Sequence, residues 1–374
     1  MIKIFFISLI NLIKFFKIDE KKREFVFYSE SYFYKDHFVD LIDNLIKLNQ
    51  KNMIYVTSDL NDFNFFKNKL NCFYIGNFFI LSLFFSILRC KFMIMTLTDI
   101  GNHLKKSKNC QYFVYFFHAS ASTHYIYTDD AFKNYDIILT NGDYQKKELI
   151  EAENRFNFPK KTIINTGYFF LDFLRNNANL NKKEDRHILF APTWNYNKKN
   201  LFNDYAFQII EKLIDKNFIV TFRPHPEHLK RSKATLSKIL NKFNKNSNFY
   251  FDTDSSNLNS LEKAALIITD NSSIVFEFLL VFKRPILYIN YSIKLHNLNT
   301  HKISDKTLEG SFKKEFGNEL NVDNLDKLSD IYDQVSGNEN NINEKVNNFN
   351  KRYFTNLGNS ANIAAKYLIT KNNL

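Results

Sequence analysis

The sequence predicts an α/β protein of two doubly wound domains, preceded by a short amphipathic helix. Its 374 residues exceed the ~250–300 at which a single core stops growing. Apolar runs of strand length alternate with helical patterns along most of the chain, and a polar, asparagine-rich segment at 175–186 separates two such alternations. We expect domains at 19–176 and 187–340, flanked by helical segments at 1–18 and 341–374.

The first alternation contains five clear strand patterns and a well-defined helix. In segment 36–49 apolar residues recur at steps of three and four, which predicts a helix with one face against a sheet. The strand patterns are FVFY, MIYVTS, YFVYFFH, DIILT and TIINTGY, at 25–28, 53–58, 112–118, 136–140 and 162–168. Strands joined through helices predict a parallel sheet.

The most apolar stretch runs from Cys72 to Thr96 and carries its first charge at Arg89. A membrane span is one interpretation, but Gly76 and Asn77 interrupt the stretch. Its helical part, FFILSLFFSILR, has twelve residues, whereas a span needs ~20. We expect a strand, a buried helix and a second strand, FMIMT.

The second alternation begins at His187 and carries four of the five prolines. Pro192, Pro224, Pro226 and Pro285 lie at strand ends or beginnings, where ligand sites form in such folds. The strand patterns are 187–194, 218–226, 249–252, 265–270 and 285–290, and the helical patterns are 203–216, 227–243 and 272–282. An asparagine-rich stretch follows near 337–350, before a closing helix with Ala361, Ala364, Ala365 and Leu368.

The first seventeen residues, MIKIFFISLINLIKFFK, are apolar and basic, and charged residues follow them instead of a small-residue cleavage site. On a helical wheel one half carries the polar side chains and the other half is apolar; the polar residues are Lys3, Ser8, Asn11, Lys14 and Lys17. This pattern is typical of a helix lying in a membrane surface. A helix packed on the core of its own domain is the alternative.

Overall composition restricts the partners and the compartment. Lysine plus arginine exceed aspartate plus glutamate by 51 − 39 = 12, which favours an anionic partner such as nucleic acid, acidic lipid or a phosphorylated substrate. The lysines are dispersed and no nucleic-acid-binding module is recognisable, so we expect no nucleic-acid partner. Cys72, Cys90 and Cys110 are odd in number and lack metal-site spacing, which fits a reducing cytosol.

The segment TFRPHPEH, residues 221–228, directly follows a predicted strand. Its prolines restrict the backbone, so Arg223 and His225 project from a strand end. Arginine offers a planar fork to phosphate oxygens, and histidine can donate a hydrogen bond or act as an acid. Two alternatives remain open: a metal site with His228, whose spacing does not match a helical zinc pair, and a purely structural turn.

The segment 265–290 places small polar residues between a strand and an apolar helix. Ser272 and Ser273 lie at the expected helix N-terminus, where free N–H groups and the helix dipole favour an anion. Asp270, after the strand-end Thr269, could instead cap the helix. Glu277 lies in an otherwise apolar part of the helix, where a carboxylate needs partners. A ribose diol or an internal ion pair would supply them.

His118 ends the strand pattern YFVYFFH and precedes small residues, so its ring has room for a substrate. A base in that place could deprotonate an attacking hydroxyl. Histidines at strand ends are also often structural.

Together these segments resemble the CDP-glycerol glycerophosphotransferase family, the teichoic-acid primases and polymerases of GT-B fold, which has two Rossmann-like domains facing a cleft. The matching segments are FFHAS, INTGYFFLDF, ILFAPTWN, TFRPHPEH and IITDNSSIVFEFLLVFKRPILYIN, about 180 residues in the same order. This chain has Ala119 where the family usually has glycine, and it lacks the family's lysines shortly after.

The resemblance implies roles for particular residues. His118 would be the catalytic base of the acceptor domain, and His225 the second catalytic histidine. Arg223, His225, Ser272 and Ser273 would hold the donor pyrophosphate beside Thr269 and Asp270, with Glu277 near the cytidine ribose. No metal or cofactor is implied, because side chains and a helix terminus can neutralise the leaving CMP.

The resemblance also implies partners and a location. The donor would be CDP-glycerol or another nucleotide-diphosphate compound, and the acceptor a lipid-linked or polysaccharide chain in teichoic-acid or capsule synthesis. The protein would be cytoplasmic, peripheral on the inner face of the cell membrane. A GT-B glycosyltransferase that uses a nucleotide sugar for capsule or lipopolysaccharide synthesis is the enzymatic alternative. A nonenzymatic binder of nucleic acid or lipid is the other.

Overall fold

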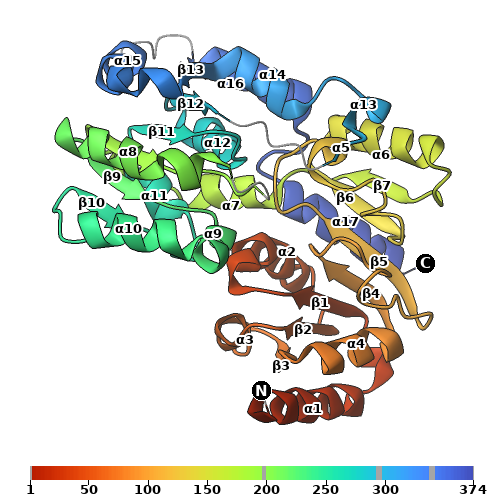
Figure 1. The fold of residues 1–374 in the computed structure, drawn as a ribbon. Coiled ribbons are helices and arrows are strands. Elements are labelled where there is room, and N and C mark those ends of the chain that lie inside the picture. Colours follow the sequence, from red (N-terminus) through yellow and green to blue (C-terminus); the bar gives the residue numbers. More distant parts are fainter. Residues whose placement is uncertain (1, 196–198, 292–296, 337–341, 374) are drawn as a thin grey trace. The chain divides into compact units, whose positions relative to one another are not determined.

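The computed structural model describes residues 2–195, 199–291, 297–336 and 342–373, which form two compact units (Figure 1). Unit 1 comprises residues 1–173, 297–305 and 353–374, and unit 2 comprises residues 174–296 and 306–352. The predicted linker, 175–186, begins beside the first boundary between the units. The chain returns to unit 1 twice, whereas the sequence prediction divided the chain into consecutive domains.

Unit 1 is built on a parallel sheet of seven strands in the order β3-β2-β1-β4-β5-β6-β7. The strands are β1 (Phe25–Ser29), β2 (Met53–Thr57), β3 (Asn71–Tyr74), β4 (Cys90–Met95), β5 (Cys110–Phe116), β6 (Ile137–Thr140) and β7 (Thr162–Asn165). Every strand expected in the first alternation is confirmed. The strand order reverses between β1 and β4, so ligands are expected near the carboxyl ends of these strands.

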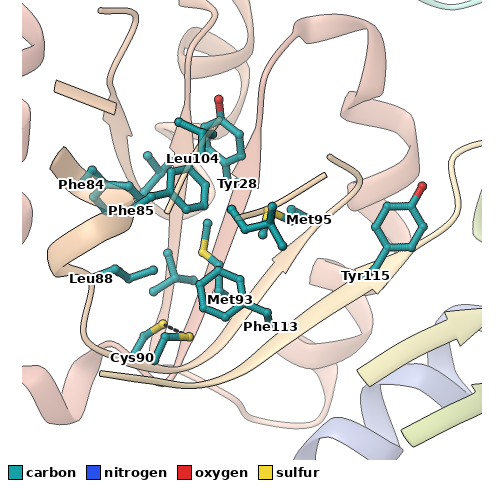
Figure 2. Close-up of a cluster of buried hydrophobic side chains, with 14 of the residues drawn as sticks. Tyr28, Phe84, Phe85, Leu88, Cys90, Met93, Met95, Leu104, Phe113 and Tyr115 are labelled. Carbon is teal, nitrogen blue, oxygen red and sulfur yellow. Dashed lines mark hydrogen bonds between the residues drawn. The ribbon is translucent and has the colours of Figure 1, made fainter. Parts of the chain in front are cut away.

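Both faces of this sheet are buried, as in parallel sheets generally. In β1, Val26 and Tyr28 join one core cluster, whereas Phe25 and Phe27 join the other. Figure 2 shows part of the first cluster, with Phe84 and Phe85 near Tyr28. The helices of unit 1 are α1 (Ile2–Lys17), α2 (Lys35–Lys47), α3 (Leu60–Phe66), α4 (Phe78–Ile87), α5 (Thr123–Ile126), α6 (Asp143–Arg155), α13 (Thr300–Ile303) and α17 (Ser360–Asn372), with α7 (Phe169–Asn177) crossing the boundary and 3-10 turns η1 (Glu20–Lys22) and η2 (Tyr32–Tyr34).

Helix α1 packs on α4 and β3 through a narrow face. Leu12 and Phe15 are buried in the core, and the Ser8 hydroxyl accepts hydrogen bonds from the amides of Gly76 and Asn77, both at 3.1 Å. Ser8 therefore faces the domain, so the polar half of the helical wheel contains a residue of the packed face. Two short polar contacts and a few apolar side chains hold the helix, which leaves the rest of its apolar surface uncovered.

Helix α4 is half buried, which corrects the expectation of a fully buried helix. Ile80, Leu81, Phe84 and Phe85 face the core, whereas Phe78, Phe79, Leu83 and Ile87 are 57%, 77%, 44% and 41% exposed. No helix in the described parts of the chain has the length and apolar character to cross a membrane. The segment is thus neither a membrane span nor core throughout.

The closing helix α17 belongs to unit 1, where it packs against α2. Ala361, Ala364, Ala365 and Leu368, the apolar face expected from the sequence, are all buried. The Asp172 carboxylate of α7 accepts hydrogen bonds from the amides of Gly358 and Ser360, at 2.6 and 2.8 Å, just before and at the start of the helix. Gly167 has φ of +101° and no room for a Cβ beside Ser360, so glycine is required there.

Unit 2 is built on a second parallel sheet, in the order β10-β9-β8-β11-β12-β13, which reverses between β8 and β11. The strands are β8 (His187–Phe190), β9 (Ile219–Phe222), β10 (Phe249–Phe251), β11 (Leu266–Thr269), β12 (Ile286–Asn290) and β13 (Gly317–Asn321). The helices are α8 (Leu201–Asp215), α9 (Pro226–Arg231), α10 (Lys233–Phe243), α11 (Leu258–Lys263), α12 (Ile274–Glu277), α14 (Leu308–Phe316), α15 (Leu328–Ser336) and α16 (Ile342–Tyr353), with the shorter turns η3 (Leu180–Lys182) and η5 (Val322–Lys327).

Three details of unit 2 differ from the sequence prediction. The helix expected at 227–243 is broken at Ser232 into α9 and α10. The helix expected at 272–282 is one α-helical turn, α12, followed by the π-helix η4 (Phe278–Phe282). Strand β13 was missed because its sequence, GNELN, is polar, as suits the exposed edge of a sheet. Of the asparagine-rich stretch 337–350, residues 337–341 lie outside the described residues and the rest begins α16.

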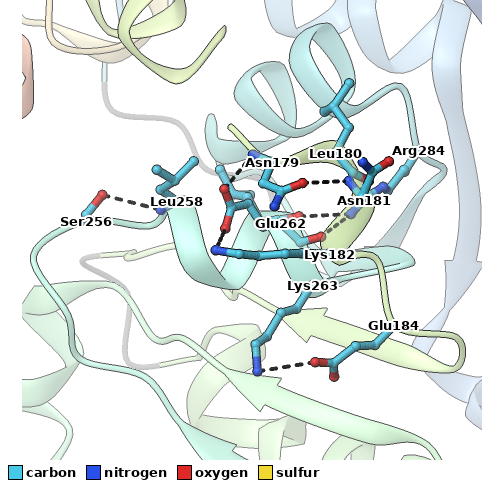
Figure 3. Close-up of polar contacts among 11 residues, drawn as sticks. Asn179, Leu180, Asn181, Lys182, Glu184, Ser256, Leu258, Glu262, Lys263 and Arg284 are labelled. Atoms are coloured by element: carbon cyan, nitrogen blue, oxygen red, sulfur yellow. Dashed lines mark hydrogen bonds and ion pairs between the residues drawn. The ribbon is translucent and has the colours of Figure 1, made fainter. Parts of the chain in front are cut away.

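Buried polar contacts tie the segment after α7 to unit 2 (Figure 3). The Glu262 carboxylate, 2% exposed as a residue, accepts hydrogen bonds from the Asn179 amide at 2.7 Å and from Lys182 Nζ at 2.6 Å. The Arg284 guanidinium donates to the carbonyls of Leu180, Leu261, Glu262 and Ala264. The predicted linker is therefore fastened to the second sheet over part of its length.

Candidate active site

His118 lies just beyond the end of β5, on the edge of the unit 1 sheet where the strand order reverses one strand away. Two hydrogen bonds hold the backbone around it: the Tyr168 hydroxyl donates to the His118 carbonyl at 3.2 Å, and Asn141 Nδ2 donates to the Ala119 carbonyl at 3.2 Å. The position of the imidazole is therefore set by β6 and by the loop after β7, as well as by β5.

The His118 ring is surrounded by aromatic side chains. The Tyr34 ring is 5.1 Å from it and the His37 ring is 6.3 Å from it, centre to centre. Nδ1 of His118 is buried, and no described residue forms a hydrogen bond with it. Burial lowers the pKa of His118 to about 4, partly opposed by a hydrogen bond to the Thr96 backbone. At neutral pH the imidazole is uncharged and can accept a proton.

In unit 2, Arg223 directly follows β9 and is held by the chain after β10. Its Nη1 forms an ion pair with the Asp252 carboxylate at 2.6 Å, and its Nη2 donates to the Asp254 carbonyl at 2.8 Å. Ser260 donates a further hydrogen bond to Asp252. Arg223 is thus fixed in direction, and Asp252 balances its charge, which sequence reasoning did not anticipate.

The two histidines of TFRPHPEH have different environments. His225 is exposed and caps α9, since its Nδ1 accepts a hydrogen bond from the Glu227 amide at 3.2 Å. His228 is fully buried and stacks on Phe202 with ring centres 3.9 Å apart. Its nitrogens lie 3.1 Å from Ser232 Oγ and 3.0 Å from the Thr193 carbonyl. His228 is therefore a packing residue, and only His225 is accessible to a ligand.

Thr269 and Asp270, at the end of β11, contact the loop that follows β8. The Thr269 hydroxyl donates to the Ala191 carbonyl at 2.6 Å, and the Asp270 carboxylate accepts from the Thr193 amide at 2.8 Å. Both residues are buried. Their observed contacts fix the shape of the β8 loop at the edge where the strand order of unit 2 reverses.

Ser272 and Ser273 are partly exposed and immediately precede α12, for which Ser273 is the N-cap residue. Glu277 ends that single α-helical turn and is 4% exposed. The π-helix η4 follows directly, a feature frequent at functional sites. The serines therefore present hydroxyl groups at the same sheet edge as Asp270.

The structure places His118 in unit 1 and the other predicted site residues in unit 2. Within unit 2 the segments that follow β8, β9 and β11 begin at the same edge of the sheet, because parallel strands have their carboxyl ends together. Sequence reasoning missed Asp252, Tyr34 and His37. Asp252 could have been found, because it ends the strand pattern FYFD. The other two lie in and beside a helix start, where no motif marks them.

Comparison with known proteins gives a family match and several similar structures. Residues 117–366 match the family described as CDP-glycerol:poly(glycerophosphate) glycerophosphotransferase. This region is two thirds of the chain and contains all the predicted site residues. No curated protein sequence matches the chain.

The similar structures have low sequence identity to this chain. The wall teichoic acid polymerase TagF has a TM-score of 0.64 at 14% identity, over 100% of this chain and 98% of that chain. MnaA from S. aureus, solved with UDP, has a TM-score of 0.62 at 10% identity, over 94% of this chain and 97% of that chain. The UDP-GlcNAc 2-epimerase of Methanocaldococcus jannaschii has a TM-score of 0.55 at 14% identity, over 93% of this chain and 99% of that chain. These similarities show the GT-B-like fold with its two parallel sheets.

The family match covers β6 and β7 of the first sheet, the whole second sheet and both groups of candidate residues, and the fold agrees with that of a teichoic acid polymerase. This chain is therefore a transferase of the teichoic-acid type and belongs to the CDP-glycerol:poly(glycerophosphate) glycerophosphotransferase family.

Proposed function

We propose that this protein transfers glycerol phosphate, or a related alditol phosphate, from a CDP-activated donor to a lipid-linked or polymeric acceptor in teichoic-acid or capsule synthesis. The family match over 117–366 carries the proposal. A solved TagF variant was soaked with CDPG, which fits a CDP-linked donor for related folds.

The donor would bind at the carboxyl edge of the unit 2 sheet. His225 and the hydroxyls of Ser272 and Ser273 are accessible there, and each can donate a hydrogen bond to a phosphate oxygen. Arg223, whose direction is set and whose charge is balanced by Asp252, would add guanidinium N–H donors. Glu277 would accept hydrogen bonds from the cytidine ribose. Thr269 and Asp270 would act indirectly, by holding the loop after β8.

His118 would act as the general base. The acceptor hydroxyl gives its proton to the imidazole while its oxygen attacks the phosphorus that bears glycerol. The bond from that phosphorus to the bridging oxygen breaks, and CMP leaves with the electron pair. Arg223, His225 and the serines would stabilise the charge that develops on CMP. The low pKa of His118 keeps the base uncharged before the reaction.

The test is CMP release from CDP-glycerol in the presence of membrane-derived acceptor. We expect His118→Ala and His225→Ala each to abolish release, whereas His103→Ala, an exposed histidine in unit 1, leaves it unchanged. General-base removal alone costs about 10²–10⁴-fold in rate. Full activity in both site variants would refute the assigned roles. Turnover of a nucleotide sugar but not of CDP-glycerol would establish the glycosyltransferase alternative.

We further propose that the protein works at the inner face of the cell membrane, bound through α1 and α4. The exposed stripe on α1 consists of Ile2, Phe6, Ile10 and Ile13, which are 76%, 56%, 50% and 50% exposed. Helix α4, in contact with α1, adds Phe79 and its neighbours. Surface patches of this kind mark interaction sites. Lys3, Lys14 and Lys17 flank the stripe and suit anionic lipid headgroups.

Flotation with phosphatidylglycerol vesicles tests this location. Deleting α1 would remove Leu12 and Phe15 and uncover the core residues on which they pack, such as Phe73 and Phe84, so substitutions on the exposed face are preferable. We expect the double variant Phe6→Ser, Ile10→Ser and the double variant Phe79→Ser, Leu83→Ser each to float less. Leu298→Ser, at a position 77% exposed elsewhere in unit 1, should float like the wild type. Equal flotation of all the variants would refute the proposal.

A further inference from the structure

The first turn of α2 buries three consecutive polar residues. Lys35, Asp36 and His37 are 9%, 6% and 7% exposed. Lys35 Nζ and the Asp36 carboxylate form an ion pair at 2.6 Å, so these two charges satisfy each other. Nδ1 of His37 is buried, and no described residue forms a hydrogen bond with it. An unsatisfied buried polar group destabilises the folded protein, so a histidine at this place calls for an explanation.

His37 lies beside the candidate base. Helix α2 follows β1, and His118 follows β5, so both residues reach the sheet edge from either side of β4. The two rings are 6.3 Å apart and perpendicular, at 90°. Phe170 packs against the His37 ring at 4.3 Å, and Tyr34 packs against the His118 ring. Two buried nitrogens without a partner in the described structure thus belong to neighbouring rings.

The distance between the two ring centres is compatible with one hydroxyl group hydrogen-bonded to both rings. A hydroxyl oxygen hydrogen-bonded to one nitrogen of each imidazole lies ~4 Å from each ring centre. Rings 6.3 Å apart then subtend roughly a tetrahedral angle at that oxygen, which is the angle a hydroxyl prefers. A neutral imidazole offers one N–H donor and one acceptor nitrogen.

We propose that His37 is a second histidine of the acceptor site and binds the alcohol group of a polyol phosphate acceptor. The hydroxyl donates its proton to His118 and accepts a hydrogen bond from the His37 N–H. His37 thus orients the oxygen of the acceptor hydroxyl through one of its lone pairs, and His118 takes the proton of that hydroxyl. This inference rests on the proposed phosphotransfer for its reaction, and on the contacts of His37 for its site.

Burial supports the donor role of His37. The pKa of His37 lies well below its ordinary value because of burial and because His118 and Lys35 disfavour a further charge. His37 therefore stays neutral at physiological pH, and does not compete with His118 for the proton of the acceptor.

The variant His37→Phe separates a binding role from a structural one. Phenylalanine keeps the aromatic shape and removes the unsatisfied nitrogen, so we expect the protein to be at least as stable as the wild type in urea unfolding. We expect kcat/KM for the acceptor to fall about 10- to 100-fold, because the nucleophile loses its orientation, while CDP affinity is unchanged. His124→Phe is the matched control: it removes the contacts of a buried histidine with Ser304 and Glu148 in the same unit, and should lose stability but keep acceptor kcat/KM.

The comparison uses whichever donor the wild-type protein turns over, since His37 concerns the acceptor alone. A second measurement needs no turnover: imidazole NMR signals are followed during titration with glycerol 3-phosphate. We expect the signals of His37 and His118 to shift and that of His124 to stay. Unchanged acceptor kinetics in His37→Phe, or no shift at His37, would overturn the proposal. Failure of CDP-glycerol turnover alone would refute only the donor assignment.

Discussion

Buried histidines of this chain fall into two groups according to their partners. His187 has Glu184 at 2.6 Å from Nδ1 and Thr221 at 2.7 Å from Nε2, and His228 also has a partner at each nitrogen. His37, His118 and His124 each have a buried Nδ1 that no described residue contacts through a hydrogen bond. His124 differs from the other two, because its Nδ1 lies 3.4 Å from the Glu148 carboxylate and its Nε2 lies 3.2 Å from the Ser304 carbonyl. Satisfied histidines hold strands and loops together, whereas unsatisfied ones are candidates for ligand contact.

The pH dependence of activity should reflect the low pKa of His118. Because this pKa is about 4, the free enzyme keeps its base unprotonated well below the ordinary histidine range. We expect the acid limb of kcat/KM that arises from His118 to have its midpoint near pH 4. Initial rates between about pH 4 and pH 8 measure it. A midpoint near the ordinary histidine pKa, about 6.5, would contradict this environment.

His228 should link stability to pH. Burial lowers the pKa of His228 from its ordinary value of about 6.5 to about 4, so the folded state binds a proton less readily than the unfolded state. The contribution of neutral His228 to the free energy of unfolding is complete above about pH 6.5. It is lost as the pH falls toward 4, and the loss is at most ~3 kcal/mol. Urea unfolding at both ends of this window measures it. We expect His228→Asn to be less stable at neutral pH and to show a smaller loss on acidification; an unchanged slope would refute the linkage.

At the scale of elements, the attachment of α1 depends on few contacts. Ser8 supplies the acceptor for two amides at the start of α4, so one hydroxyl joins the two helices that carry the proposed membrane surface. Ser8 belongs to the polar half of the helical wheel, yet it is buried, because α1 packs on β3 and α4. A polar residue in an apolar helix therefore marked the packed face.

Removing the Ser8 hydroxyl should loosen this junction. We expect Ser8→Ala to leave the Gly76 and Asn77 amides without their acceptor and to lower the free energy of unfolding by about 1–3 kcal/mol. Hydrogen exchange should be faster at these two amides. Ser86→Ala is the control, since the Ser86 hydroxyl bonds only the Leu83 carbonyl within α4. Equal exchange in wild type and Ser8→Ala would show that the hydrogen bonds contribute nothing.

At the scale of the whole molecule, the net charge of +12 and the apolar surface of α1 and α4 would act together in the proposed membrane binding. Raising salt from about 0.1 M to about 1 M shortens the Debye length from about 10 Å to about 3 Å. We expect affinity for anionic vesicles to fall over this range but not to vanish, because apolar insertion is not screened. Complete release would mean that charge alone binds the membrane. Vesicle cosedimentation measures the outcome, with neutral phosphatidylcholine vesicles as the control.

Local pattern was sufficient for most strands and for the main motifs. The strands of both sheets were predicted except β13, and Arg223, His225, Ser272 and Ser273 follow strands as expected. Buried parallel strands are continuous apolar runs, so they can be predicted from the sequence alone. The edge strand β13 could not be predicted in this way, because its residues are polar. It forms a strand because it pairs with β12.

The sequence by itself determined the α/β class, the two alternations, and the strand ends that carry His118 and the phosphate-binding candidates. Only the tertiary structure decided that α17 joins unit 1, that Asp252 balances Arg223, and that His37 lies beside His118. It also decided which face of α1 and α4 is exposed. The physical reason is common to these cases: periodicity reports which residues share a face of an element, whereas the partner of that face depends on segments distant in the chain.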